Sequence, residues 1–182
     1  VTTPEAERAE RIREVIARRP RRARQVDVRV VASNEGRDQS AFLIGCRDVL
    51  LGGAYDLVVK LHSKKTPQDG FNVGRHFKEQ QYENLLNSAG YTANLLALFQ
   101  REPGLGLVFP PTIHIGYPTM GRGWWSNKPG FAVLAEQLGI RVPLDDLTPL
   151  APYGSMFIAR PEALRLLASH EWQYAQFGGA EA

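Results

Sequence analysis

Short apolar segments with strand-like composition alternate along this chain with segments whose apolar residues recur at helical spacing. Strands are predicted at residues 26–32, 55–61, 105–109 and 153–159, and helices at 5–19, 38–52, 75–88, 91–101 and from Pro161 onward. This alternation favours an α/β fold, a three-layer sandwich with a mostly parallel sheet.

The size and composition of the chain narrow the possible classes. At 182 residues, of which 43% are apolar, the chain has the size and composition of about one soluble domain. No apolar run approaches the roughly 20 residues that a membrane helix needs, and no secretory signal opens the chain. We therefore expect a cytoplasmic protein. Its single cysteine, Cys46, cannot form an internal disulfide, and we expect it to pack in the core.

The basic charge of the chain is confined to its N-terminal part. Residues 1–24 contain eight arginines and four glutamates, a net charge of +4, and the remainder is close to neutral. We therefore predict a basic helix and linker at 1–24 and a single α/β domain at 25–182. A basic arm that binds anionic lipid or a partner protein is the alternative. The chain begins at Val1 without methionine and ends in Gly-Gly-Ala-Glu-Ala, so we expect a domain truncated at both ends.

Polar residues follow the first predicted strand. Ligands of open α/β sheets bind beyond the carboxyl ends of the strands. There, Gly36 permits close approach of the backbone, Asn34 and Asp38 can hydrogen-bond a ribose or base, and Arg37 can bind phosphate. A plain turn is the alternative.

The second predicted strand ends in cationic residues. Because side chains alternate between the two faces of a strand, Lys60, His62 and Lys64 share one face. A lysine buried in an apolar strand is costly unless an anion meets it, which favours a bound diphosphate. A solvated edge strand is the alternative.

A long segment rich in proline, glycine and aromatic residues, 110–130, separates the third and fourth strands, and it is too long for a simple connection. Its flat rings and amide group suit the binding of sugar rings, although tryptophans also fill protein cores. The candidates are His114, Tyr117, Trp124, Trp125 and Asn127.

The fourth strand begins with Gly154 and Ser155, a pair that suggests close approach by a ligand or by backbone. Together with Asn34–Asp38 and Tyr55–Lys65, the segment Gly154–Pro161 resembles the rhamnan synthesis protein F family. Its members have Asn-x-Gly-Arg-Asp, then Tyr-Asp-x-Val-x-Lys-x-His-(Ser/Thr)-Lys-Lys, then Gly-Ser-Met-Phe-x-x-Arg-Pro. The resemblance covers about residues 26–167.

The resemblance implies a function in building rhamnose-containing polysaccharides of the cell surface, such as lipopolysaccharide or cell-wall glycans. Family members resemble glycosyltransferases of the GT-A type, which normally begin with a strand, a helix and a strand that cradle the nucleotide base. We expect this chain to lack that opening. The resemblance implies a transfer of a deoxyhexose, L-rhamnose from a dTDP donor, to a glycan or lipid-linked acceptor. It also places Lys65 in the donor site and the protein at the inner face of the plasma membrane.

Ordinary GT-A enzymes hold a divalent metal with Asp-x-Asp at the end of the second predicted strand. This chain has Leu61-His-Ser-Lys64 there and no Asp-x-Asp anywhere, so we expect no cofactor and no metal. Cationic side chains would then stabilise the leaving diphosphate.

Candidates for the general base of an inverting transferase are Asp145 and Asp146, with Glu171 and Glu181 as further carboxylates. A surface role is the alternative for each of them. A non-catalytic module that binds a glycan or nucleotide is the alternative to an enzyme. A third reading, nucleic-acid binding through the arginine-rich N-terminus, is not supported by the rest of the chain, and we expect no nucleic-acid partner.

Overall fold

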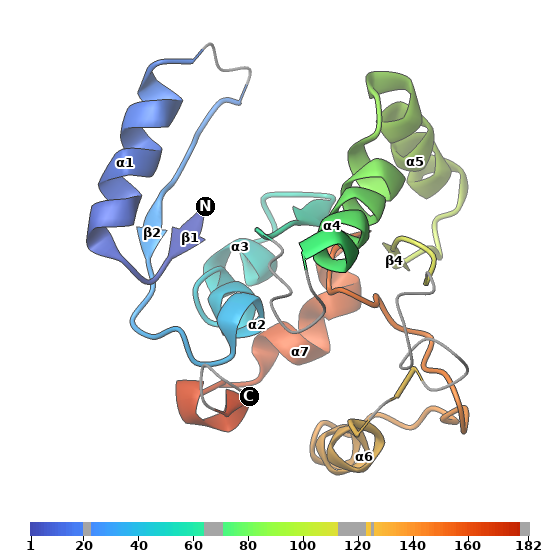
Figure 1. The fold of residues 1–182 in the computed structure, drawn as a ribbon. Helices are drawn as coiled ribbons and strands as arrows, with labels where there is room; N and C mark the ends of the chain where they lie inside the picture. Colours follow the sequence, from blue (N-terminus) through green and yellow to red (C-terminus); the bar gives the residue numbers. More distant parts are fainter. Residues whose placement is uncertain (20–22, 64–70, 113–122, 125, 179–182) are drawn as a thin grey trace. The chain divides into compact units, whose positions relative to one another are not determined.

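The computed structural model describes residues 1–19, 23–63, 71–112, 123–124 and 126–178 (Figure 1). The chain divides into two compact units, Val1–Ala54 with Arg165–Ala182, and Tyr55–Leu164. Strands and helices alternate in both units, which confirms the mixed α/β class, but the described strands form two small sheets.

The first unit opens with a strand, a helix and a strand. β1 (Thr2–Thr3) and β2 (Arg29–Val30) pair in parallel, and α1 (Ala6–Ala17) connects them. Parallel neighbours need such a crossover because a tight turn joins only antiparallel strands. This corrects the expectation that the chain lacks an opening strand-helix-strand. The first strand is two threonines long, too short to produce an alternation of apolar residues.

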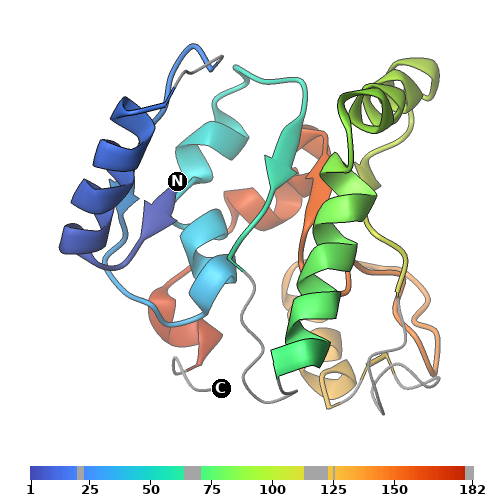
Figure 2. The same cartoon turned by 45° about the horizontal axis from the view of Figure 1, so that its top comes forward.

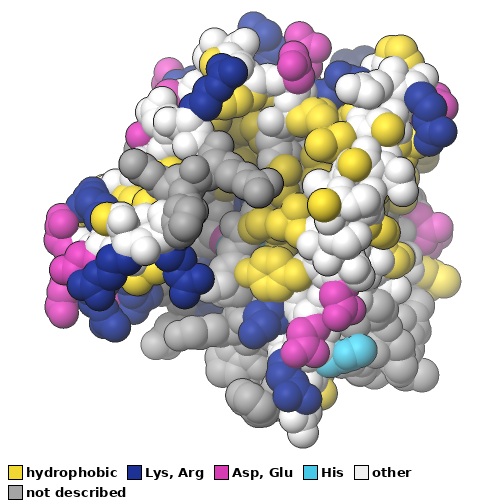
Figure 3. Space-filling view, turned by 90° about the horizontal axis from the view of Figure 1, so that it is seen from above, with side chains coloured by type: hydrophobic (Ala, Val, Ile, Leu, Met, Phe, Trp, Pro, Cys, Tyr) yellow, Lys and Arg dark blue, Asp and Glu magenta, His cyan; other side chains and the backbone are white. Residues whose placement is uncertain are grey.

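Three arginines in and next to α1 pair with glutamates one turn earlier. The ion pairs are Arg8–Glu5, Arg13–Glu10 and Arg18–Glu14. Figure 3 shows the two charges intermixed on the side where Figure 1 draws α1. Exposed pairs of this kind stabilise a helix only slightly. Residues 5–18 contain four arginines and four glutamates, so the net positive charge of the N-terminal part lies after this stretch. The helix predicted at 5–19 is confirmed.

Two short helices replace the one that the sequence predicts after the first strand. α2 (Arg37–Leu43) ends before Gly45, and α3 (Arg47–Leu51) starts after it. A Cβ at Gly45 would lie 2.6 Å from Ala41 O and 2.8 Å from the Val31 side chain. Glycine therefore allows the chain to turn closely between the two helices.

The C-terminal segment packs on these helices within the first unit. Arg47 donates from Nε to Ala168 O at 2.9 Å and from Nη2 to Ser169 O at 3.2 Å, at the end of α7 (Arg165–Ser169). The 3₁₀ helix η4 (Tyr174–Phe177) contacts α2. Carbonyls at a helix end have no partner inside the helix, and Arg47 supplies one.

The sheet of the second unit contains β3 (Val58–Lys60), β4 (Leu107–Val108) and β5 (Phe157–Ala159). Its order is β3-β5-β4, and β5 runs antiparallel to both neighbours. This corrects the expectation of a mostly parallel sheet. β5 is buried along its length, as the central strand of a parallel sheet would also be, so its composition does not reveal its direction.

Two helices cover this sheet, as the sequence predicts. α4 (Phe71–Leu86) and α5 (Ala89–Arg101) pack on each other, and Figure 2 shows α4 beside the sheet strands. Ser88 caps α5, because its Oγ accepts a hydrogen bond from Tyr91 N at 3.1 Å. The core is formed by the buried side chains of Leu85, Phe99, Met156 and Ile158.

Two helical elements of the second unit follow β4. α6 (Lys128–Gln137) has a proline in its first turn, and the sequence does not predict this helix because its start lies in the proline- and glycine-rich segment. η3 (Pro161–Leu164) is a 3₁₀ turn at the place where Pro161 predicts the start of a helix, and it leads directly into α7.

Arg160 ties the last turn of α5 to the sheet. Its Nη2 donates to Phe99 O at 2.6 Å and its Nε to Leu105 O at 3.0 Å. Its guanidinium carbon lies 5.6 Å from the centre of the Phe99 ring. This arginine, part of the Gly-Ser-Met-Phe-x-x-Arg-Pro motif, therefore has a structural role.

We expect Arg160→Met to lower the free energy of unfolding by about 2–3 kcal/mol, because two carbonyls lose a charged donor. Urea denaturation measures the change. Arg101→Met, which alters an exposed arginine at the end of α5, is the control. Equal unfolding free energies for the two variants would contradict the structural role of Arg160.

Candidate functional site

The end of β3 brings a cation to the start of β5. Lys60 is 4% exposed, and its Nζ donates to Ser155 O at 2.8 Å. In the ladder Lys60 is opposite Phe157, and its Nζ lies 5.9 Å from the centre of that ring. The predicted partners Lys64 and Lys65 lie outside the described residues.

His62 contacts the same stretch of backbone. Its Nε2 lies 2.9 Å from Gly154 O and 3.4 Å from Ser155 Oγ. A carbonyl oxygen only accepts, so Nε2 must hold the hydrogen of this bond. Tyr82 donates its hydroxyl hydrogen to His62 O at 2.8 Å. The structure thus brings four predicted site residues together: Lys60, His62, Gly154 and Ser155.

Gly154 and Ser155 form a tight turn at the start of β5. Ser155 N donates to Pro152 O at 2.7 Å, and the φ angles of Gly154 and Ser155 are +95° and +56°. A Cβ at Gly154 would lie 2.9 Å from both Gln81 Oε1 and Phe77 Cζ. The close approach that the sequence predicts at Gly154 is therefore made, on this side, by α4.

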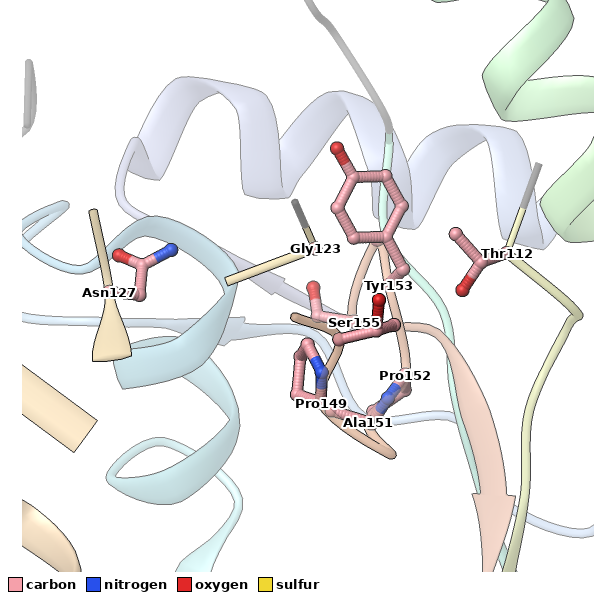
Figure 4. Close-up of a pocket in the computed structure, with 10 residues that line it drawn as sticks. Thr112, Gly123, Asn127, Pro149, Ala151, Pro152, Tyr153 and Ser155 are labelled. Carbon is pink, nitrogen blue, oxygen red and sulfur yellow. The ribbon is translucent and has the colours of Figure 1, made fainter. Parts of the chain in front are cut away.

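A pocket of about 210 Å³ lies beside this turn (Figure 4). In this view Tyr153 and Ser155 lie between Asn127 on one side and Thr112 on the other. The other residues that line the pocket are mostly apolar or small: Gly123, Thr148, Pro149, Ala151, Pro152 and Gly154. Ligand pockets commonly measure about 300–1,000 Å³, so this one has room for one group of a larger ligand.

The structure describes two of the five residues proposed to bind sugar. Asn127 lines the pocket and precedes α6. Trp124 is 8% exposed, donates from Nε1 to Asp145 O at 2.8 Å and packs on Phe131 at 5.3 Å between ring centres. His114, Tyr117 and Trp125 lie outside the described residues.

The two candidate bases have defined partners. Asp145 Oδ1 accepts hydrogen bonds from Leu147 N and Thr148 N, both at 2.7 Å. These bonds, that of Thr148 first, hold the pKa of the Asp145 carboxyl below its ordinary value. Asp146 pairs with Lys128 Nζ at 2.8 Å. A carboxylate with a lowered pKa is a weaker base, so these contacts favour a structural role for Asp145.

We expect Asp145→Asn to melt near the wild-type temperature, because the amide oxygen still accepts from both N–H groups. Asp145→Ala loses that acceptor and should melt about 2–4 °C lower. Thermal denaturation of the two variants measures the difference in melting temperature. If the Asn variant folds normally but loses all donor turnover, Asp145 is a base after all.

The other predicted donor residues lie in the first unit. Arg37 N donates to Asn34 O at 3.0 Å, and Gly36 and Arg37 have φ angles of +73° and +50°. A Cβ at Gly36 would lie 2.4 Å from the Phe177 Cβ, so glycine is needed for packing here. Asp38 lies in the first turn of α2. That this turn and the Lys60 site meet on one ligand stays a prediction.

The sequence did not single out two buried glutamines of α4. Gln81 is 1% exposed and Gln80 is 7% exposed. Gln81 falls between Phe77 and Leu85 on the apolar face of the helix, four residues from each. A polar residue in the middle of an apolar stripe was the signal that could have identified it.

The described residues also bear on metal binding and on membrane spanning. No group of three or more His, Cys, Asp or Glu side chains in these residues could hold a metal ion. Within the same ranges, every helix is too short or too polar to cross a membrane.

Comparison with known proteins places the chain in a family. No curated protein and no solved structure matches it. The family model for rhamnan synthesis protein F matches residues 1–181, almost the whole chain. This confirms the resemblance seen in the three sequence motifs. The chain therefore belongs to the rhamnan synthesis protein F family, which links it to the synthesis of rhamnan.

Proposed function

We propose that the chain is a glycosyltransferase domain that transfers a deoxyhexose, L-rhamnose, from a dTDP donor to a cell-surface polysaccharide. The observation that supports this most directly is the meeting of Lys60 and His62 at the turn formed by Gly154 and Ser155. Both side chains bond main-chain carbonyls of that turn, and the turn lines a pocket. A buried ammonium next to an imidazole can hold an anionic diphosphate.

The reaction needs positive charge near the diphosphate of the donor. The glycosidic bond to the diphosphate is cleaved as the acceptor hydroxyl attacks, and negative charge develops on the leaving diphosphate. This negative charge would be stabilised by Lys60, His62, Lys64, Lys65 and Arg37. Since the sequence has no Asp-x-Asp, we propose that no divalent metal is needed. Loss of transfer in EDTA, with recovery in Mg²⁺ or Mn²⁺, would contradict this.

The remaining parts of the donor and acceptor have proposed places. The nucleoside would bind at Asn34 and Asp38, beside the opening strand-helix-strand, in the manner of GT-A enzymes. The acceptor sugar would bind near Asn127, with Trp124 or Trp125 as its platform. Peripheral contact with the inner face of the plasma membrane would bring a lipid-linked acceptor to the site.

A non-catalytic binding module is the second candidate, and one observation favours it. The carboxylates of Asp145 and Asp146 are engaged by backbone N–H groups and by Lys128, respectively. Neither is therefore set up as a general base in the described structure. Such a module would bind the nucleotide or a glycan within a polysaccharide synthesis complex and leave the donor intact.

Donor turnover separates the two candidates. The full chain is incubated with dTDP-L-rhamnose without an acceptor, and released dTDP is measured. A transferase releases dTDP slowly, and His62→Ala should slow the release at least tenfold with little change in melting temperature. Binding without release would identify a module. An equal loss of folding and activity in His62→Ala would remove His62 from the proposed mechanism.

A further inference from the structure

The side-chain oxygen of Gln81 is buried without a partner. Gln81 Oε1 exposes less than 1 Å² and has no hydrogen bond in the part of the chain that the structure describes. A buried acceptor without a donor costs about 1–3 kcal/mol. Buried polar atoms in folded proteins nearly always have a hydrogen-bond partner, so this unpaired oxygen needs an explanation.

The orientation of the amide follows from its neighbours. Pro111 O can only accept, so the group that faces it at 2.8 Å must be the Nε2 of Gln80. The Gln80 Oε1 then accepts from Gln81 Nε2 at 2.7 Å. If Gln81 were turned over, two oxygens would face each other. The unpaired atom of Gln81 is therefore its oxygen and not its nitrogen.

This oxygen lies next to a residue that lines the pocket. Oε1 is 2.9 Å from the place where a Cβ would stand on Gly154. Any other residue at this position would put a side chain against the oxygen. Gly154 and Ser155 both have positive φ angles, and the Gly154 carbonyl on the same turn bonds His62.

We propose that Gln81 binds the sugar of the donor: its Oε1 accepts a hydrogen bond from a ring hydroxyl. The inference rests on the proposed function and names the group that the site recognises. The diphosphate cannot be the partner of Oε1, because its oxygens are acceptors and Oε1 is an acceptor too. Since Oε1 is covered, the Pro152–Ser155 turn must shift when the sugar binds.

Calorimetric titration of the full chain with dTDP and dTDP-L-rhamnose tests this. Gln81→Met keeps the length of the side chain and leaves the Gln80 oxygen as the unpaired acceptor, so the melting temperature should change little. We expect Gln81→Met to bind dTDP-L-rhamnose about tenfold more weakly and dTDP unchanged. Gln100→Met, on the exposed surface of α5, is the control.

A second measurement uses the wild-type chain, so it does not depend on the folding of the variant. dTDP-sugars that lack one ring hydroxyl each are titrated, and one of them should bind about tenfold more weakly. That loss should disappear in Gln81→Met. Unchanged binding of dTDP-L-rhamnose by Gln81→Met, or an equal loss for dTDP, would overturn the role of Gln81. If the wild-type chain binds dTDP and dTDP-L-rhamnose equally well, the role of Gln81 is overturned but the nucleotide site is not. If it binds neither ligand, the proposed function itself is contradicted.

Discussion

Lys60→Met is expected to weaken the binding of dTDP about 100-fold while the chain stays folded. Lys60 is 4% exposed at the end of β3, where its ammonium lies beside the backbone of Gly154 and Ser155. Removal of a charged donor from a buried anion site costs about 2–3 kcal/mol of binding, which corresponds to this change in Kd. Methionine fills nearly the same volume, and an apolar side chain in place of a buried ion often leaves stability unchanged or raises it.

Calorimetry measures the affinity for dTDP, and thermal denaturation of the same samples shows whether the variant is folded. Arg101→Met, at the exposed end of α5, is the matched control because it removes one positive charge from the same unit. It should bind dTDP as the wild type does. If Lys60→Met binds dTDP normally, the buried ammonium does not hold the diphosphate. If it unfolds, Lys60 is needed for the sheet.

Gly154→Ala is expected to impair both folding and binding. The new Cβ would lie 2.9 Å from Gln81 Oε1 and Phe77 Cζ, and alanine is disfavoured at a φ angle of +95°. Backbone strain of this kind costs about 1–3 kcal/mol, which lowers the melting temperature by several degrees. Movement of the turn also displaces the carbonyl that His62 bonds, so dTDP should bind more than tenfold more weakly.

Gly90→Ala is the matched control for this variant. Gly90 lies in α5, where a Cβ would meet nothing within 4 Å, and alanine favours helix. Its melting temperature should stay at or slightly above that of the wild type. A Gly154→Ala chain with wild-type stability and affinity would show that the turn tolerates a side chain and is not held in one conformation.

The sequence predicted the elements of the fold better than their arrangement. Apolar spacing located α4, α5 and the strand at Phe157–Ala159, because each buries apolar side chains at the spacing of its secondary structure. The direction of β5 could not be read, since burial on both faces is compatible with a parallel or an antiparallel neighbour. β1 was missed because a strand of two threonines has no periodicity to detect.

Part of the site could also be predicted from the periodicity of the sequence. The alternation of side chains along β3 placed Lys60 and His62 together, and their contacts with Gly154 and Ser155 join two segments that are distant in the sequence. Gln81 was missed because helical spacing marks a position as buried without saying what a polar atom there will face. The pocket depends on turns after α6, whose geometry has no periodic signal.

Calorimetric titration of the purified chain with dTDP, UDP and GDP, each with and without Mg²⁺, tests whether the chain has a metal-independent donor site. We expect dTDP to bind without metal and Lys60→Met to abolish most of this binding. Failure of all three nucleotides to bind, or binding only in the presence of Mg²⁺, would contradict a metal-independent donor site at the end of β3.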